Sequence, residues 1–183
     1  RLSQELRKAL ILRVSLDHYT AARHDEERGS HAFRSALEGL VWATQNGFQA
    51  TVAGRTVWGE SPDSARAGYA RLFAKHAIPI DAKDPAQLVL FPEMHSGTEV
   101  PEISTRCWKT LGKSPSDVMC SSSRMVVRRK GSHRAAVVSC TLLPYDTQFE
   151  LGHTLKEAAK PVALNHRYCA QFCVLGGGSC SAN

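Results

Sequence analysis

The sequence predicts an α/β fold followed by a small cysteine-rich domain, and three features lead to this prediction. In the first half, short apolar runs alternate with amphipathic helical segments, which is typical of βαβ units and a parallel sheet. The second half carries a predicted β-hairpin and a short helix. All six cysteines also lie there, and five of them fall in the last third of the chain: Cys120, Cys140, Cys169, Cys173 and Cys180.

Residues 11–17, 48–54 and 87–91 have the character of buried parallel strands. The first ends in small polar residues, at the strand end where α/β folds hold ligands. Between the first two strands, apolar residues from Phe33 to Val41 repeat with helical spacing. Ser61 and Pro62 then predict the start of the second crossover helix.

Three strands are too few for a complete barrel or Rossmann domain, so we expect the back end of a larger α/β unit. Residues 1–10 have the pattern of the last turns of a helix already under way, and the chain begins with Arg1, which indicates a fragment. Because residues 99–115 connect the two halves, we expect domains at 1–98 and 99–183.

The second domain is predicted to contain a hairpin, with strands near 125–128 and 135–138 around a turn at Gly131. Thr154 and Glu157 form a capping-box pattern, which predicts a short helix that ends at Pro161. We expect the residues after it to be irregular.

Composition indicates an ordinary globular chain, with 43% hydrophobic and 22% charged residues. The net charge is +6, and one basic cluster stands out: Arg124, Arg128, Arg129, Lys130 and Arg134. We favour a solvated basic hairpin over nucleic-acid binding. The sequence shows no apolar run of about 20 residues and no opening signal peptide, so we expect no membrane partner and a cytoplasmic location. Thiols stay reduced there and can bind metal.

The hairpin brings Cys120 and Cys140 to the same end, and the C-terminal cysteines can fold over them. Four thiolates suit either zinc or an iron–sulfur cluster. The chain shows no Cys-x2-Cys knuckle of the kind common in zinc ribbons, and the wider spacings favour a cluster. The alternative is a set of buried cysteines without function. We expect Cys107 to be a core residue.

The residues 11–17, His24-Asp25, Arg28-Gly29 and the helix that follows resemble the second half of a radical S-adenosylmethionine (SAM) barrel. The hairpin bounded by Cys120 and Cys140, with the cysteines at 169–180, resembles the SPASM or twitch extension of that superfamily. The resemblance implies the C-terminal part of a partial (β/α)6 barrel and an auxiliary [4Fe-4S] cluster. It covers nearly the whole chain.

The resemblance also implies roles for individual residues. Ser15 and Asp17 would face SAM, and Arg28 would pair with the SAM carboxylate, although a surface arginine that caps a loop is an equal alternative. The cluster ligands would be Cys120, Cys140, Cys169 and Cys173, with Cys180 competing for one place. Five candidate cysteines suit the one-cluster twitch form better than the two-cluster SPASM form.

The Cys-x3-Cys-x2-Cys motif that defines the superfamily does not occur in this chain. We therefore expect the radical-generating site in a missing N-terminal half and no SAM cleavage by this chain alone. The implied partners are a peptide or small-molecule substrate and an electron donor such as flavodoxin or ferredoxin. Glu93, just past a strand end, is a candidate catalytic acid or base. Two alternatives stay open: a zinc module that binds nucleic acid or protein through the basic hairpin, and an inactive fragment.

Overall fold

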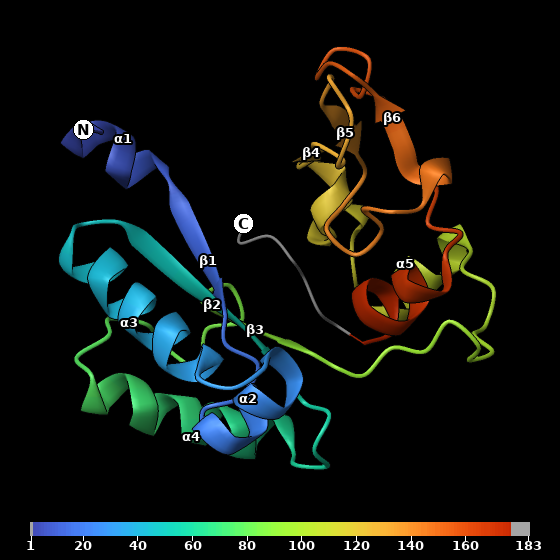
Figure 1. The fold of residues 1–183 in the computed structure, drawn as a ribbon. Coiled ribbons are helices and arrows are strands. Elements are labelled where there is room, and N and C mark those ends of the chain that lie inside the picture. The colour runs from blue at the N-terminus through green and yellow to red at the C-terminus, as the bar shows by residue number, and fades with distance from the viewer. Residues whose placement is uncertain (1, 177–183) are drawn as a thin grey trace. The chain divides into compact units, whose positions relative to one another are not determined.

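The structure, a computed structural model, describes residues 2–176 and divides into two compact units between Glu93 and Met94 (Figure 1). Sequence analysis put a domain boundary slightly later, after residue 98. Each unit has its own small sheet, and the described strands form no closed barrel. Among the described residues, no helix is long and apolar enough to cross a membrane.

The first unit is built on a three-stranded parallel sheet of order β1-β2-β3. Its strands and helices alternate along the chain, so the predicted parallel sheet is confirmed. Their bounds are α1 Gln4–Ala9, β1 Ile11–Ser15, α2 Ala21–Arg28, α3 Ala32–Gln45, β2 Gln49–Arg55, α4 Pro62–Lys75 and β3 Leu88–Phe91.

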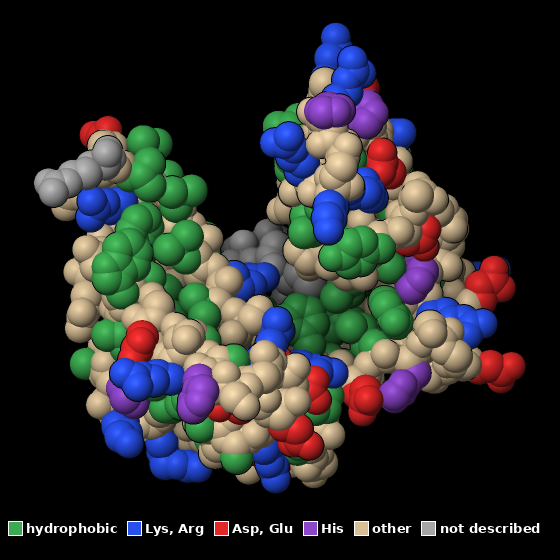
Figure 2. All heavy atoms as spheres, in the orientation of Figure 1, with side chains coloured by type: hydrophobic (Ala, Val, Ile, Leu, Met, Phe, Trp, Pro, Cys, Tyr) green, Lys and Arg blue, Asp and Glu red, His purple; other side chains and the backbone are tan. Residues whose placement is uncertain are grey.

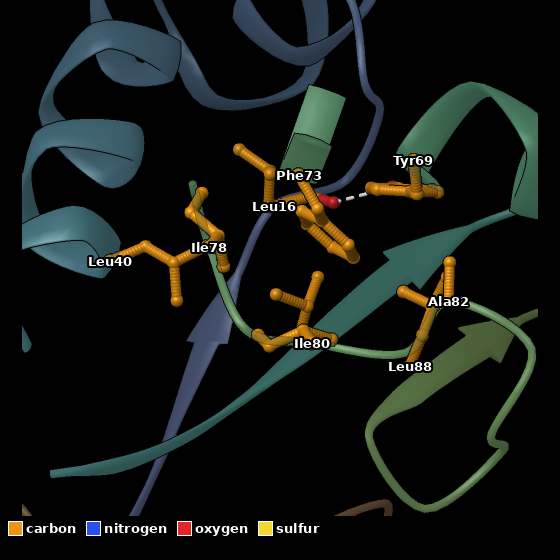
Figure 3. Packing of buried hydrophobic residues seen from close by; sticks show 9 residues of the cluster. Leu16, Leu40, Tyr69, Phe73, Ile78, Ile80, Ala82 and Leu88 are labelled. Carbon is orange, nitrogen blue, oxygen red and sulfur yellow. Dashed lines mark hydrogen bonds between the residues drawn. The ribbon is translucent and has the colours of Figure 1, made fainter. Parts of the chain in front are cut away.

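One face of this sheet packs against α3 and α4. The hydrophobic core consists of Leu16, Leu40, Val52, Tyr69, Phe73, Ile78, Ile80, Ala82 and Leu88. Figure 3 shows the Tyr69 hydroxyl among these side chains, where it donates a hydrogen bond to the backbone oxygen of Leu16 at 2.6 Å. This bond joins α4 to the carboxyl end of β1, where Asp17 follows.

Local sequence explains why α4 forms where it does. The Ser61 hydroxyl accepts a hydrogen bond from the Ser64 N–H at 3.2 Å, and Pro62 takes the first helical position. Ala65, Tyr69 and Phe73 recur every fourth residue and are all buried, so one stripe of the helix faces the sheet.

The other face of the sheet carries both polar and apolar side chains. Successive residues of a strand point to opposite faces, so Arg13 and Ser15 project away from the side of Val14, which packs against the core. The Arg13 guanidinium donates to the Thr51 hydroxyl of β2 at 3.2 Å. The strand register places Ile11 of β1 and Val89 of β3 on this same face.

The second unit holds a three-stranded antiparallel sheet of order β4-β5-β6. Its regular elements are α5 Thr105–Leu111, β4 Met125–Val127, β5 Ala136–Val138, β6 Glu150–Gly152 and the π-helix η4 Cys169–Val174, with short 3-10 turns at Pro115–Asp117, Met119–Ser121 and Thr147–Phe149. The predicted hairpin is confirmed, and Gly131 takes a positive φ of 81° in its turn. Figure 2 shows Lys, Arg and His side chains gathered at the end of this unit that carries the turn.

Three predictions for the second unit are wrong. The segment after Thr154 forms a single turn, not a helix, because Pro161 follows too closely for the capped turn to continue. Residues 169–174, expected to be irregular, form a π-helix. Cys107 is not a core residue; it is half-buried, and its sulfur accepts from the Ser104 N–H at the start of α5.

Candidate metal centre and ligand site

Four of the predicted ligand residues line one cavity in the second unit: Cys120, Cys140, Cys169 and Cys173. They come from three separate segments. Cys120 lies in the 3-10 turn before β4, Cys140 follows β5, and the other two lie in η4. The remaining walls are largely apolar, formed by Met119, Leu142, Leu143, Phe149, Val162 and Leu164. Cys180 lies outside the described residues.

The π-helix places two cysteines on one side of η4. Cys169 and Cys173 are four positions apart, and the Leu175 N–H donates to the Ala170 oxygen at 2.9 Å, the i→i+5 bond of a π-helix. Isolated π-turns are uncommon and occur often at functional sites. Cys169 is 7% exposed, so its thiol points to the interior of the unit rather than to solvent.

Burial keeps the thiols of Cys169 and Cys120 neutral in the absence of metal. It raises the pKa of Cys169 to about 11 and also raises the pKa of Cys120. The nearby Cys140 raises both pKa values further, since a second thiolate repels the first. A cation that binds here must displace the protons, because thiolate is the form that ligates metal.

Two cationic side chains hold the cysteine-bearing segments through backbone oxygens. Arg124 donates to the oxygen of Cys120 at 2.6 Å and to those of Ala158 and Lys160 at 3.0 and 2.9 Å. Lys113 donates to the oxygen of Val174 in η4 at 2.8 Å. These contacts fix the backbone of both segments and place positive charge beside the thiols.

The cavity also contains one buried hydroxyl that has no hydrogen-bond partner among the described residues. Ser139 is 1% exposed, lines the cavity next to Cys140, and its Oγ is unsatisfied. A buried hydroxyl in an apolar pocket favours the binding of a polar or charged group there.

Four thiols are a donor set that suits either zinc or an iron–sulfur cluster. Within residues 2–176, no group of three or more His, Cys, Asp or Glu side chains is arranged to hold a metal ion as the side chains stand. Tetrahedral zinc at about 2.3 Å from each sulfur would draw the sulfurs to about 3.8 Å from one another. An iron–sulfur cluster spreads its ligands, because each cysteine binds a different iron.

The space between the thiols is about 20 Å³, enough for one water molecule. A larger pocket of about 440 Å³ lies next to it, and both are lined by Cys120, Val162 and Leu164. A cluster needs more room than the space between the thiols provides, so the surrounding side chains would have to move on binding. The donor set itself, four thiols within apolar walls, has the chemistry of a cluster site.

The first unit has a second candidate site at the carboxyl end of β1. The Arg28 guanidinium donates twice to the Asp17 carboxylate, at 2.6 and 3.0 Å. Asp17 is 3% exposed, whereas the Arg28 side chain is 48% exposed. The hydrogen bond to Asp17 raises the pKa of Arg28. Arg28 therefore caps the buried carboxylate and keeps part of its guanidinium at the surface.

His24 supports this pair from α2. It is 1% exposed, and its Nδ1 accepts the backbone N–H of Asp17 at 2.9 Å. A backbone N–H can only donate, so Nδ1 is unprotonated and the neutral ring carries its proton on Nε2. Burial lowers the pKa of His24. The role of His24 here is to fix the backbone of Asp17.

A neighbouring polar group links β1 to the loop after β2. His18 is 1% exposed and contacts the Glu60 carboxylate through Nε2 at 2.8 Å, and the Tyr19 hydroxyl donates to the same carboxylate at 3.0 Å. The Thr20 N–H donates to Nδ1 of His18 at 2.9 Å. Because both ring nitrogens of His18 are used, the group holds the two strand-end loops together.

The predicted ligand-site residues are distributed as follows. Ser15, Asp17 and Arg28 lie together at the carboxyl end of β1, with Ser15 exposed. Arg28, expected to pair with the carboxylate of SAM, pairs with Asp17 instead. Glu93 is exposed beyond β3 at the end of the first unit.

Sequence reasoning missed His18, Ser139 and Lys113. His18 directly follows Asp17 at a strand end, and this position could have marked it as a candidate site residue. Ser139 precedes a candidate ligand, but its burial depends on strand pairing. The contact of Lys113 with η4 spans 61 positions, and nothing local indicates it.

Comparisons with protein-family models, curated proteins and solved structures find no match for this chain. Functional assignment therefore rests on the residues and geometry of the two sites.

Proposed function

We propose that this chain is the C-terminal portion of a radical SAM enzyme, with an auxiliary [4Fe-4S] cluster in its second unit. One observation carries the proposal: Cys120, Cys140, Cys169 and Cys173 come from three segments and line a single cavity with largely apolar walls. The resemblance of both halves of the sequence, in this order, adds to that observation.

When bound, an iron–sulfur cluster supplies one-electron chemistry. The chain's own residues would hold it and set its surroundings. Four thiolates would ligate the irons, and the apolar walls would exclude water. Arg124 and Lys113 would offset part of the negative charge of the thiolates, since positive charge and hydrogen bonds near the sulfurs favour the reduced state.

The first unit would supply half of the barrel and part of the SAM site. Asp17 follows the carboxyl end of β1, and His24 and Arg28 of α2 contact it there, at the edge of the sheet where α/β folds bind ligands. Asp17 uses two of the five N–H donors of Arg28. The half-exposed guanidinium therefore keeps donors for a ligand carboxylate, and the exposed Ser15 is the last residue of the same strand. SAM cleavage would need the Cys-x3-Cys-x2-Cys motif, which this sequence does not contain.

The parent enzyme would act on a peptide or small molecule held at the strand ends and would take electrons from a donor such as flavodoxin or ferredoxin. Glu93 stays a weak candidate for acid–base chemistry there. A cytoplasmic location suits the free thiols of Cys120, Cys140 and Cys169.

Anaerobic reconstitution with iron and sulfide, followed by metal analysis and Mössbauer spectroscopy, tests the proposal. We expect about four irons and four sulfides per chain, with the spectrum of a cubane cluster. A protein that binds no iron under these conditions would overturn it.

The second candidate function is a zinc module that contacts nucleic acid or protein. The exposed basic turn, with Arg128, Lys130 and Arg134, favours it. A colourless protein that contains stoichiometric zinc after the same reconstitution would establish this function in place of the first.

A further inference from the structure

The hydroxyl of Ser139 is the one described oxygen that lines the cysteine cavity, is buried and has no hydrogen-bond partner. The residue lies directly after β5 and directly before Cys140. Its backbone is fixed, because the Ser139 N–H donates to the Phe149 oxygen at 3.1 Å. The side chain therefore cannot reach solvent by a small shift of the strand.

A buried hydroxyl without a partner costs stability, and native proteins seldom keep one. Apart from the thiols, the cavity walls near Ser139 are mostly aliphatic or aromatic, so they offer no strong acceptor. A hydroxyl is a poor ligand for soft metals compared with thiolate. Donation of its proton to a negatively charged sulfur in the cavity would give this hydroxyl a partner.

We infer that Ser139 donates a hydrogen bond to a sulfur of the cluster that Cys140 helps to hold. The inference rests on the proposed function and goes beyond it, because it assigns a residue that sets the reduction potential. Reduction adds negative charge to the cluster, and a hydrogen bond to sulfur stabilises that charge. Ser139 is thus a positioning and tuning residue rather than a ligand, and it raises the potential of the cluster.

The test compares Ser139→Ala with Ser121→Ala. Ser121 follows Cys120 as Ser139 precedes Cys140, but it is exposed and its hydroxyl donates to the Ser116 oxygen at 3.1 Å. It is therefore a matched serine beside a candidate ligand that faces away from the cavity. Ser139→Thr keeps the hydroxyl and serves as the conservative variant.

Without metal, we expect Ser139→Ala to unfold at the same denaturant concentration as the unaltered protein or at a higher one, because the change removes an unsatisfied group. With the cluster loaded, we expect a more negative midpoint potential and faster loss of iron to a chelator. Electron–nuclear double resonance of the reduced cluster detects nearby protons, and those that exchange are identified by their loss in D2O. We expect the Ser139→Ala protein to lack one exchangeable proton signal that the unaltered protein shows. Ser121→Ala should match the unaltered protein in all three measurements, and Ser139→Thr should keep the proton signal.

The outcomes separate the two proposals. If the unaltered protein binds an iron–sulfur cluster but Ser139→Ala keeps its potential and its proton signal, the inference is overturned and the proposed function stands. A metal-free Ser139→Ala protein that is clearly less stable would also overturn it, because the hydroxyl would then have a structural partner. If the unaltered protein binds no iron, both proposals fail together.

Discussion

At the scale of single residues, the buried carboxylate of Asp17 depends on one cation. The Arg28 guanidinium donates to both of its oxygens, at 2.6 and 3.0 Å. We expect Arg28→Met to lower the free energy of unfolding by about 1–3 kcal/mol, because it leaves a buried acceptor without its charged donor. The lower part of that range applies, since the guanidinium is half-exposed and solvent screens the pair.

Chemical denaturation of the two proteins at pH 7 measures this difference. Arg34→Met is the matched control, because Arg34 pairs with Glu38 on the exposed surface of α3. We expect no measurable loss there. Equal effects of the two changes would show that the Asp17–Arg28 pair contributes nothing beyond an ordinary surface ion pair.

Two buried histidines make the first unit sensitive to acid. Burial lowers the pKa of both His18 and His24 below the ordinary value of 6.5. Below that value the unfolded chain takes up protons that the folded histidines do not, so folding loses free energy as the pH falls. The two neutral histidines therefore make their full contribution to the free energy of folding above about pH 6.5. This contribution is lost progressively as the pH falls toward their lowered pKa values.

We expect the urea midpoint of the first unit to fall between pH 7.5 and pH 5.5. His24→Asn keeps an acceptor near the Asp17 N–H but cannot titrate, so its midpoint should depend less steeply on pH. A variant whose midpoint falls as steeply as that of the unaltered protein would rule out His24 as a source of the acid sensitivity.

At the scale of elements, the contact of α4 with β2 depends on Gly54. A Cβ at this position would lie 2.8 Å from Cζ of Tyr69 and still closer to its hydroxyl. The ring would have to move, and the hydrogen bond from Tyr69 to Leu16 would break. We expect Gly54→Ala to cost about 1–3 kcal/mol of unfolding free energy.

Gly39→Ala on α3 is the control for this change. A Cβ there meets nothing within 4 Å, and alanine favours a helix over glycine by about 1 kcal/mol. Thermal unfolding should therefore show opposite shifts for the two variants. A neutral Gly54→Ala would mean that α4 is not packed closely on the sheet.

The hydrogen bonds of Arg124 join the Cys120 turn to the segment around Ala158 and Lys160. We expect Arg124→Met to release iron from the loaded protein faster than Arg128→Met, because Arg128 is exposed and donates to the Ser132 oxygen of its own turn rather than to a cysteine-bearing segment. Arg124→Lys should be intermediate, since it keeps the charge but not the planar fork. Chelator-induced bleaching measures the rates of iron release. Equal rates for the two methionine variants would show that Arg124 does not stabilise the metal centre.

Strong local patterns explain which elements the sequence could predict. The strands of the first unit and the helices α3 and α4 follow from apolar periodicity, from Ser61-Pro62 and from the glycine after Asn46. The π-helix at Cys169–Val174 has no such signal, because its i→i+5 bonding depends on packing and on Lys113 far along the chain. The helix expected after Thr154 failed for the opposite reason: local capping was present, but too few residues followed before Pro161.

At the scale of the whole molecule, the order of the cysteines along the chain carried more information than any single residue. The hairpin register brings Cys120 and Cys140 to one end, which local reasoning could foresee. The burial of Ser139 and the convergence of η4 on the same cavity depend on tertiary packing. In the first unit, Asp17 and Arg28 could be identified from the sequence, but their mutual pairing and the role of His24 could not.

The most direct test of the account is iron content after reconstitution for a set of single Cys→Ala variants. We predict about four irons per chain for the unaltered protein, a large loss in the variants of Cys120, Cys140, Cys169 and Cys173, and no loss for Cys107→Ala. Cys180→Ala shows whether that residue takes one of the four places. Iron content in Cys140→Ala equal to that in Cys107→Ala would contradict the central claim that these cysteines form one metal centre.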